Sequence, residues 1–191
     1  GAHAVKRISL QPHDTVLVMG AGPIGIGLLH FLRMQKTKTI IADTNSFRLN
    51  YCKKYFPSFH CLDPTHPDIL KKLNEITEGK MPSVIFDATG NLDAIHQSLT
   101  YLSHAGKYIL VGLQQGNIQV NHPEFHKREA TLMSSRNATH EDFQFVIDAL
   151  QKKNIDPETM ITHRIDLNDV VNDFPKLFMQ KDQLIKAMIK C

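Results

Sequence analysis

The chain has 191 residues, a hydrophobic content of 42%, a charged content of 21% and a net charge of +3 at pH 7. These values are typical of a globular protein and leave room for one well-filled domain with an appendage. Lysines and arginines are scattered, which argues against a nucleic-acid-binding surface, and no apolar run approaches the roughly 20 residues that span a bilayer. We therefore expect neither a nucleic-acid partner nor a membrane.

Apolar runs and helix-like segments alternate along most of the chain. We predict six strands, at residues 15–20, 39–43, 59–62, 83–89, 107–112 and 130–136. We predict helices at residues 23–35, 46–56, 67–77, 91–99 and 140–152. The strands are aliphatic without strict alternation, which is typical of a parallel sheet covered on both faces. The sequence thus predicts an α/β fold, a doubly wound parallel six-stranded Rossmann sheet with helices on both faces.

The two ends of the chain do not follow this alternation. Residues 1–14 contain the back half of a helix, and we expect the front of that helix to be missing. Residues 15–155 are the predicted Rossmann domain. Residues 156–191 form a tail with a helical stretch that holds Pro175, followed by a strand-like end. The tail has no place in a self-contained six-stranded sheet.

Three glycines mark the turn between the first predicted strand and the first predicted helix. Gly20, Gly22 and Gly25 form the pattern G-x-G-x-x-G. In dinucleotide-binding folds the first glycine permits the tight turn, the second lets the backbone approach a pyrophosphate, and the third lets the helix pack on the strand. Pro23 suits the first helical position, where a missing N–H is not needed. The pattern predicts a phosphate-binding turn at the start of a helix.

An acidic residue follows at the expected distance. Asp43 ends the second predicted strand, where such folds place the carboxylate that binds the adenosine ribose hydroxyls. A helix cap for the segment that begins near Ser46 is the alternative role. Arg48 is able to hold a 2′-phosphate or to stack on the adenine. Because Asp43 is expected closer to the ribose, we predict NAD as the cofactor.

The cysteines and histidines do not form a metal-binding pattern. Three cysteines without a CxxC spacing argue against a disulfide framework and against a structural zinc site, and they favour a cytoplasmic location. His122 and His126 have the i, i+4 spacing of a helical metal pair, but Pro123 follows the first of them. We therefore expect a polar surface turn there, with a metal site as the alternative. We assign no metal ligand and no catalytic residue to this chain.

The chain resembles the coenzyme-binding portion of the zinc-dependent medium-chain dehydrogenases, a family that includes alcohol, sorbitol and threonine dehydrogenases. The resemblance rests on "DTVLVMGAGPIGIG", "ADTNSFRL", "FDATG", "YILVGL", "LMSSRNAT", "ITHRIDL" and "IKAMIKC". It is strongest to the polyol and hexonate branch. The resemblance implies that the tail returns to a catalytic domain, and that family members pair through an outer sheet edge. The edge candidates here are residues 117–120 and the neighbouring residues 130–135.

The resemblance also implies residue roles along the strand ends. Ile24 would pack beside the cofactor, while Asp43 and Arg48 would hold its adenosine half. The remaining residues would lie around the nicotinamide or its ribose, and they are Ala88, Thr89, Val111, Gly112, Leu113, Ser135 and Arg136.

The zinc-binding residues of the family have no counterpart here. The Gly-His-Glu motif and the four-cysteine lobe are absent from the chain. We therefore expect zinc only in the full-length enzyme, and we expect the chain alone to bind NAD without oxidising a small-molecule alcohol. In the full enzyme, a homodimer or homotetramer by resemblance, hydride would pass from a secondary alcohol to NAD. A stand-alone dinucleotide-binding or sensing module is the alternative function.

Overall fold

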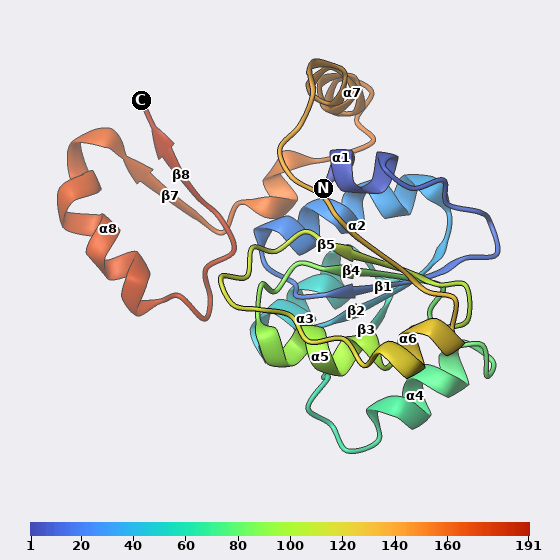
Figure 1. The fold of residues 1–191 in the computed structure, drawn as a ribbon. Coiled ribbons are helices and arrows are strands. Elements are labelled where there is room, and N and C mark those ends of the chain that lie inside the picture. Colours follow the sequence, from blue (N-terminus) through green and yellow to red (C-terminus); the bar gives the residue numbers. More distant parts are fainter.

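The computed structural model describes the whole chain, residues 1–191, as a central sheet between helices with a smaller unit beside it (Figure 1). The sheet is parallel throughout, with the strand order β3-β2-β1-β4-β5-β6. Its strands are β1 (Thr15–Met19), β2 (Lys38–Ala42), β3 (His60–Leu62), β4 (Val84–Asp87), β5 (Lys107–Leu110) and β6 (Thr131–Ser134). The predicted doubly wound six-stranded sheet is confirmed.

Helices cover both faces of this sheet, and each face has its own apolar core. Neighbouring residues of β1 point to opposite faces, so that Val18 joins one cluster and Leu17 the other. The first cluster joins the sheet to α1 (Ala2–Lys6), α2 (Pro23–Gln35), α3 (Ser46–Tyr55) and α7 (His140–Gln151). The second joins it to α4 (Ile69–Ile76) and α5 (Leu92–Leu99). In Figure 1, α1, α2 and α7 lie above the sheet and α4, α5 and α6 lie below it.

The region around His122 and His126 differs from its prediction. It is a short helix, α6 (His122–Lys127), and the interpretation as a polar surface turn was wrong. Asn121 caps this helix, because its side chain accepts a hydrogen bond from the Glu124 N–H at 3.3 Å. Pro123 lies in the first turn, where no N–H is required. The proline that argued against a helix therefore helps to start one.

The start of α4 also lies later than predicted. The helix begins at Ile69, so Pro67 precedes it. The N–H of Ile69 donates to the carbonyl of His66 at 3.0 Å and closes a separate turn before the helix. Proline disfavours helical geometry in the residue before it, which is His66 here, and this restriction fits a separate turn at that point.

The N-terminal helix is fastened to α7 by one buried carboxylate. Asp142 is 2% exposed, and its side chain lies 2.5 Å from His3 Nδ1 and 2.8 Å from Lys6 Nζ. It also accepts a hydrogen bond from the Thr139 N–H at 2.8 Å, as part of the capping box of α7. The hydrogen bonds from Lys6 and Thr139 hold the pKa of Asp142 well below its ordinary value. The start of the chain is thus tied to the face that α7 covers.

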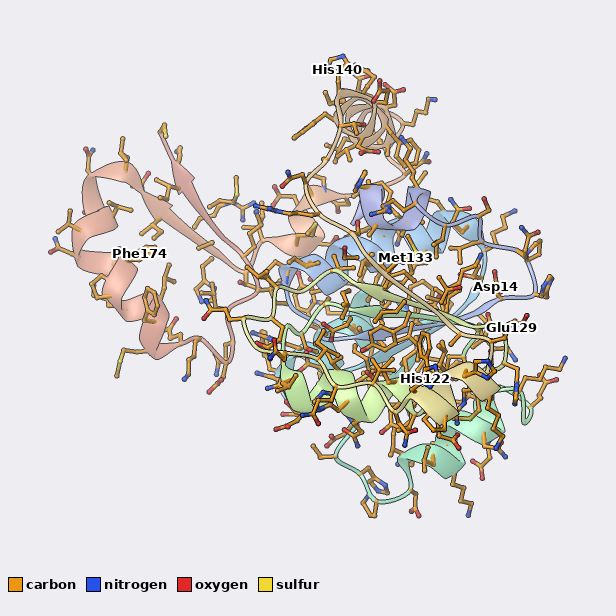
Figure 2. All side chains as sticks on the ribbon, viewed as in Figure 1. Asp14, His122, Glu129, Met133, His140 and Phe174 are labelled. Atoms are coloured by element: carbon orange, nitrogen blue, oxygen red, sulfur yellow. The ribbon has the colours of Figure 1, made fainter.

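The C-terminal segment forms a second, smaller unit. β7 (His163–Asp166) and β8 (Ala187–Lys190) make a two-stranded parallel sheet, and α8 (Val170–Met179) connects them. Two short 3-10 helices, η1 (Pro157–Met160) and η2 (Leu167–Asp169), precede and follow β7. Figure 2 shows Phe174 on α8, well away from the central sheet. No helix of the structure has both the length and the apolarity that crossing a membrane requires.

Candidate functional site

A cleft of about 390 Å³ opens at the carboxyl ends of β1, β2 and β4. This is the switch point of the sheet, because β1 has β2 on one side and β4 on the other. Ligands of open α/β sheets bind in such crevices. The cleft brings together six of the predicted site residues: Gly20, Gly22, Asp43, Arg48, Ala88 and Thr89.

Each of the three glycines of the first turn has a different structural environment. Gly20 has a φ of +96°, a conformation that residues with a side chain rarely adopt. A Cβ atom on Gly25 would lie 1.8 Å from the carbonyl oxygen of Gly20, so only glycine lets α2 start this close to the turn. A Cβ atom on Gly22 would meet nothing closer than Arg48 Nη1, at 3.8 Å. Gly22 therefore borders open space inside the cleft.

The start of α2 presents free donors to this space. The N–H groups of Ile24 and Gly25 have no hydrogen-bond partner within the chain. Pro23 occupies the first helical position, and no acidic residue lies in the first turn. Unpaired N–H groups and the positive end of the helix dipole favour an anion here. Ile24, 45% exposed, lies at the same helix start.

Asp43 connects the glycine turn to the next strand end. Its Oδ2 accepts a hydrogen bond from the Ala21 N–H at 2.6 Å, and its Oδ1 accepts one from the Asn45 N–H at 2.7 Å. Asp43 is not the cap of α3, because Asn45 has that role and accepts from the Arg48 N–H at 3.1 Å. A carboxylate accepts about four hydrogen bonds, so Asp43 is able to accept further hydrogen bonds from a ligand in the cleft.

Arg48 lies above the turn with part of its hydrogen-bonding capacity unused. Its Nη1 is 3.9 Å from Asp43 Oδ2 and 3.8 Å from the Cβ position of Gly22. Its Nε is buried and has no hydrogen-bond partner. A guanidinium group at this place matches a phosphate or a ribose oxygen in charge and in donors.

The end of β4 forms the opposite wall, and the end of β5 lies against it. Ala88 and Thr89 line the cleft after β4. A Cβ atom on Gly112 would lie 2.4 Å from the N atom of Gly90, so the segment after β5 is in direct backbone contact with this wall. Val111 is half-buried, and Leu113, with 87% of its surface exposed, extends into solvent beyond the strand.

Two predicted site residues lie farther along the sheet, beyond β5. Ser135 and Arg136 follow β6, which is separated from β4 by β5. Ser135 is buried and its N–H donates to the carbonyl of Leu110 at 2.8 Å, whereas Arg136 is exposed. Their proposed contact with a cofactor remains a prediction from family resemblance.

The sequence analysis did not predict the other residues that line the cleft. They lie at or just after the ends of β1 to β4 or on α5, and they are Met19, Ala42, Thr44, Pro64, Thr65, Asn91, Asp93, Ala94 and Gln97. Behind the wall lies Asp87, which is completely buried at the end of β4. In the sequence, the only signal for Asp87 was its position as an acidic residue at the end of an apolar strand.

The structure holds no cluster suited to a metal ion. His122 and His126 lie on α6 with their ring centroids 5.8 Å apart, and Figure 2 shows His122 at the start of this helix. Nowhere in the chain do three or more His, Cys, Asp or Glu side chains gather as a possible metal site.

Comparisons with known proteins point to one family. The family model for "Zinc-binding dehydrogenase" matches residues 23–152. The L-galactonate-5-dehydrogenase of Escherichia coli (strain K12) is 35% identical over 98% of this chain and 55% of its own length. A sorbitol dehydrogenase of Halalkalibacterium halodurans is 26% identical over 87% of this chain and 49% of its own length. The chain thus spans about half the length of these relatives.

A solved structure supports the same relationship. It is described as a short chain alcohol dehydrogenase from Escherichia coli CFT073 in complex with the cofactor NADH. It matches all of this chain and 56% of its own, with a TM-score of 0.87 and 26% sequence identity. The similarity includes the C-terminal unit as well as the central sheet.

Proposed function

We propose, because the chain belongs to the zinc-binding dehydrogenase family, that residues 1–191 are the NAD-binding part of a zinc-dependent alcohol dehydrogenase. The names of its relatives favour a polyol or a hexonate as the substrate of the whole enzyme. A stand-alone dinucleotide-binding module is not favoured, because the similarity to a full-length dehydrogenase extends over 98% of the chain.

The cleft supports the proposal by the fit of its groups to a dinucleotide. The observation that carries it is the hydrogen bond from Ala21 N–H to Asp43, which places a carboxylate beside the phosphate turn at 2.6 Å. The diphosphate would bind at the free N–H groups of Ile24 and Gly25 and beside Arg48. Asp43 would accept hydrogen bonds from the adenosine ribose, and its charge would repel a 2′-phosphate.

The reaction would divide between this chain and the rest of the enzyme. When bound, NAD supplies the acceptor for a hydride from the alcohol carbon. The residues of this chain would hold and orient that acceptor, with Thr89 and the ends of β4 and β5 on its nicotinamide side. We expect residues 1–191 to bind NADH without turning over alcohols.

We propose that the zinc ligands lie in another part of a longer protein, and that the tail packs against that part. Exposed apolar side chains on α8 and β8 support this role of the tail, and they are Val171, Phe174, Phe178, Met179, Met188 and Ile189. The coding sequence upstream of Gly1 tests the proposal. A Gly-His-Glu motif and a four-cysteine lobe are expected there, and an upstream sequence without them contradicts it.

Cofactor choice tests the role of Asp43. We expect residues 1–191 to bind NADH more tightly than NADPH, and we expect Asp43→Ser to lose or reverse this preference. The substitution removes the repelling carboxylate and leaves Arg48 free to meet the 2′-phosphate. Calorimetric titration of both cofactors gives the ratio of dissociation constants. Asp68→Ser, which removes an exposed carboxylate outside the cleft, is the matched control. Tighter binding of NADPH by the unmodified chain would refute the ribose assignment.

We propose a homodimer or homotetramer that forms through β6. Of the two candidate edge segments, residues 117–120 form no strand, whereas β6 is one of the two outer strands of the sheet and pairs only with β5. Leu132 on this strand is 37% exposed, and a free edge strand is a template for pairing with a second chain. Sedimentation at tens of micromolar is expected to show a species larger than a monomer. Leu132→Lys should shift it to the monomer, and Leu70→Lys on α4 should not. A chain that sediments only as a monomer contradicts this proposal.

A further inference from the structure

Asp87 is a buried carboxylate that holds the segment after β4. It is completely inaccessible to solvent, and its Oδ1 accepts hydrogen bonds from the Thr89 hydroxyl at 2.5 Å and from the Thr89 N–H at 3.3 Å. Its Oδ2 accepts one from the Gly90 N–H at 3.2 Å. Burial raises the pKa of the Asp87 carboxyl, and these hydrogen bonds oppose the rise. All three partners are donors, which suits an ionised carboxylate.

The backbone of the same residue holds the end of β5. The Asp87 carbonyl accepts hydrogen bonds from the N–H groups of Val111 and Gly112, each at 2.8 Å. The two segments also touch directly, since a Cβ atom on Gly90 would lie 2.6 Å from the carbonyl oxygen of Leu113. Because the interface consists of backbone without intervening side chains, a shift of one segment displaces the other.

These contacts also set what Thr89 offers to a ligand. The single hydroxyl hydrogen of Thr89 is committed to Asp87, and its oxygen accepts a hydrogen bond from the Asn91 N–H at 3.0 Å. A hydroxyl has one donor and two acceptor lone pairs, so one lone pair remains. Toward the cleft Thr89 therefore acts as an acceptor, which suits a donating hydroxyl of a sugar.

We infer that Asp87 is a positioning residue for the nicotinamide half of the cofactor, acting through Thr89 and through the ends of β4 and β5. The inference rests on the proposed function. In a doubly wound sheet the half that contains β1 to β3 binds one mononucleotide, and the half that contains β4 to β6 binds the other. Asp43 marks the first half as the adenosine side. Asp87 therefore organises the wall that faces the second nucleotide, without touching it.

The test compares NADH with ADP, which lacks the second ribose and the nicotinamide. Asp87→Asn keeps the side-chain shape but replaces one acceptor oxygen by an NH₂ group that faces donors. We expect the dissociation constant for NADH to rise about tenfold and that for ADP to change less than about twofold, because hydrogen bonds to charged groups are lost on the nicotinamide side only. Asp148→Asn on α7 is the control, since it removes a half-buried carboxylate outside the cleft.

Each outcome of the titrations has a defined meaning. Equal weakening of NADH and ADP would indicate a merely structural role and overturn the inference, as would unchanged binding of both. If Asp87→Asn does not fold, Thr89→Val and Thr89→Ser provide the comparison, because only serine keeps the hydroxyl that bonds to Asp87. A selective loss of NADH binding in the valine variant alone supports the inference, and equal behaviour of the two variants overturns it. A wild-type chain that binds neither NADH nor ADP would instead refute the proposed function.

Discussion

Gly25→Ala is expected to destabilise the protein by about 3 kcal/mol or more, the upper range for overpacking of a close contact. The added Cβ atom would lie 1.8 Å from the carbonyl oxygen of Gly20 and 2.9 Å from its carbonyl carbon. Both atoms belong to the backbone, so no side-chain rotation relieves the overlap. Either α2 moves away from β1 or the phosphate turn is displaced. For a chain of this size the loss corresponds to a fall in Tm of roughly 6–12 °C.

A second glycine of the same helix is the matched control. A Cβ atom on Gly27 would meet nothing within 4 Å. Gly27→Ala is therefore expected to stabilise the protein by about 0.5–1 kcal/mol, the usual advantage of alanine over glycine inside a helix. Thermal and urea unfolding of the two variants check the prediction. Equal stability of Gly25→Ala and Gly27→Ala would mean that α2 does not start against the turn as described.

The positions of the six strands along the chain were predictable because buried parallel strands are continuous apolar runs. Each of the six strands lies inside a predicted run or overlaps it. The short helix α6 was not predictable in the same way, because none of its residues is buried and no apolar periodicity marks it. Its signals were local ones, the cap Asn121 and the early Pro123. A proline was given more weight as a helix breaker than as a residue of the first turn.

The site residues were predictable where their role depends only on their place at the end of a strand. The glycine turn and Asp43 follow from a spacing that the fold imposes. The bond from Ala21 to Asp43 joins residues 22 apart in sequence, and it depends on the pairing of β1 with β2. Asp87 was missed because a strand that ends in an acidic residue has many possible roles. Only the structure shows that its side chain and its carbonyl hold two different segments.

Gly22→Val is expected to weaken NADH binding by about 2 kcal/mol or more, roughly 30-fold in the dissociation constant. The valine side chain would occupy the open space that we assign to the pyrophosphate, beside Arg48 at 3.8 Å. Gly22 has extended backbone angles, with φ −74° and ψ −173°, which other residues adopt without strain. The variant should therefore remain folded. Gly116→Val is the control, because a Cβ atom there meets nothing within 4 Å and lies outside the cleft.

The central claim is that the cleft between β1, β2 and β4 is a dinucleotide site. Calorimetric titration of NADH into residues 1–191 and into the Gly22→Val variant tests this claim most directly. We predict one NADH bound per chain, a loss of about 30-fold in affinity for Gly22→Val, and wild-type affinity for Gly116→Val. Circular dichroism of all three proteins confirms that they are folded. A wild-type chain that is folded and binds no NADH, or a Gly22→Val variant that binds it with unchanged affinity, would contradict the account.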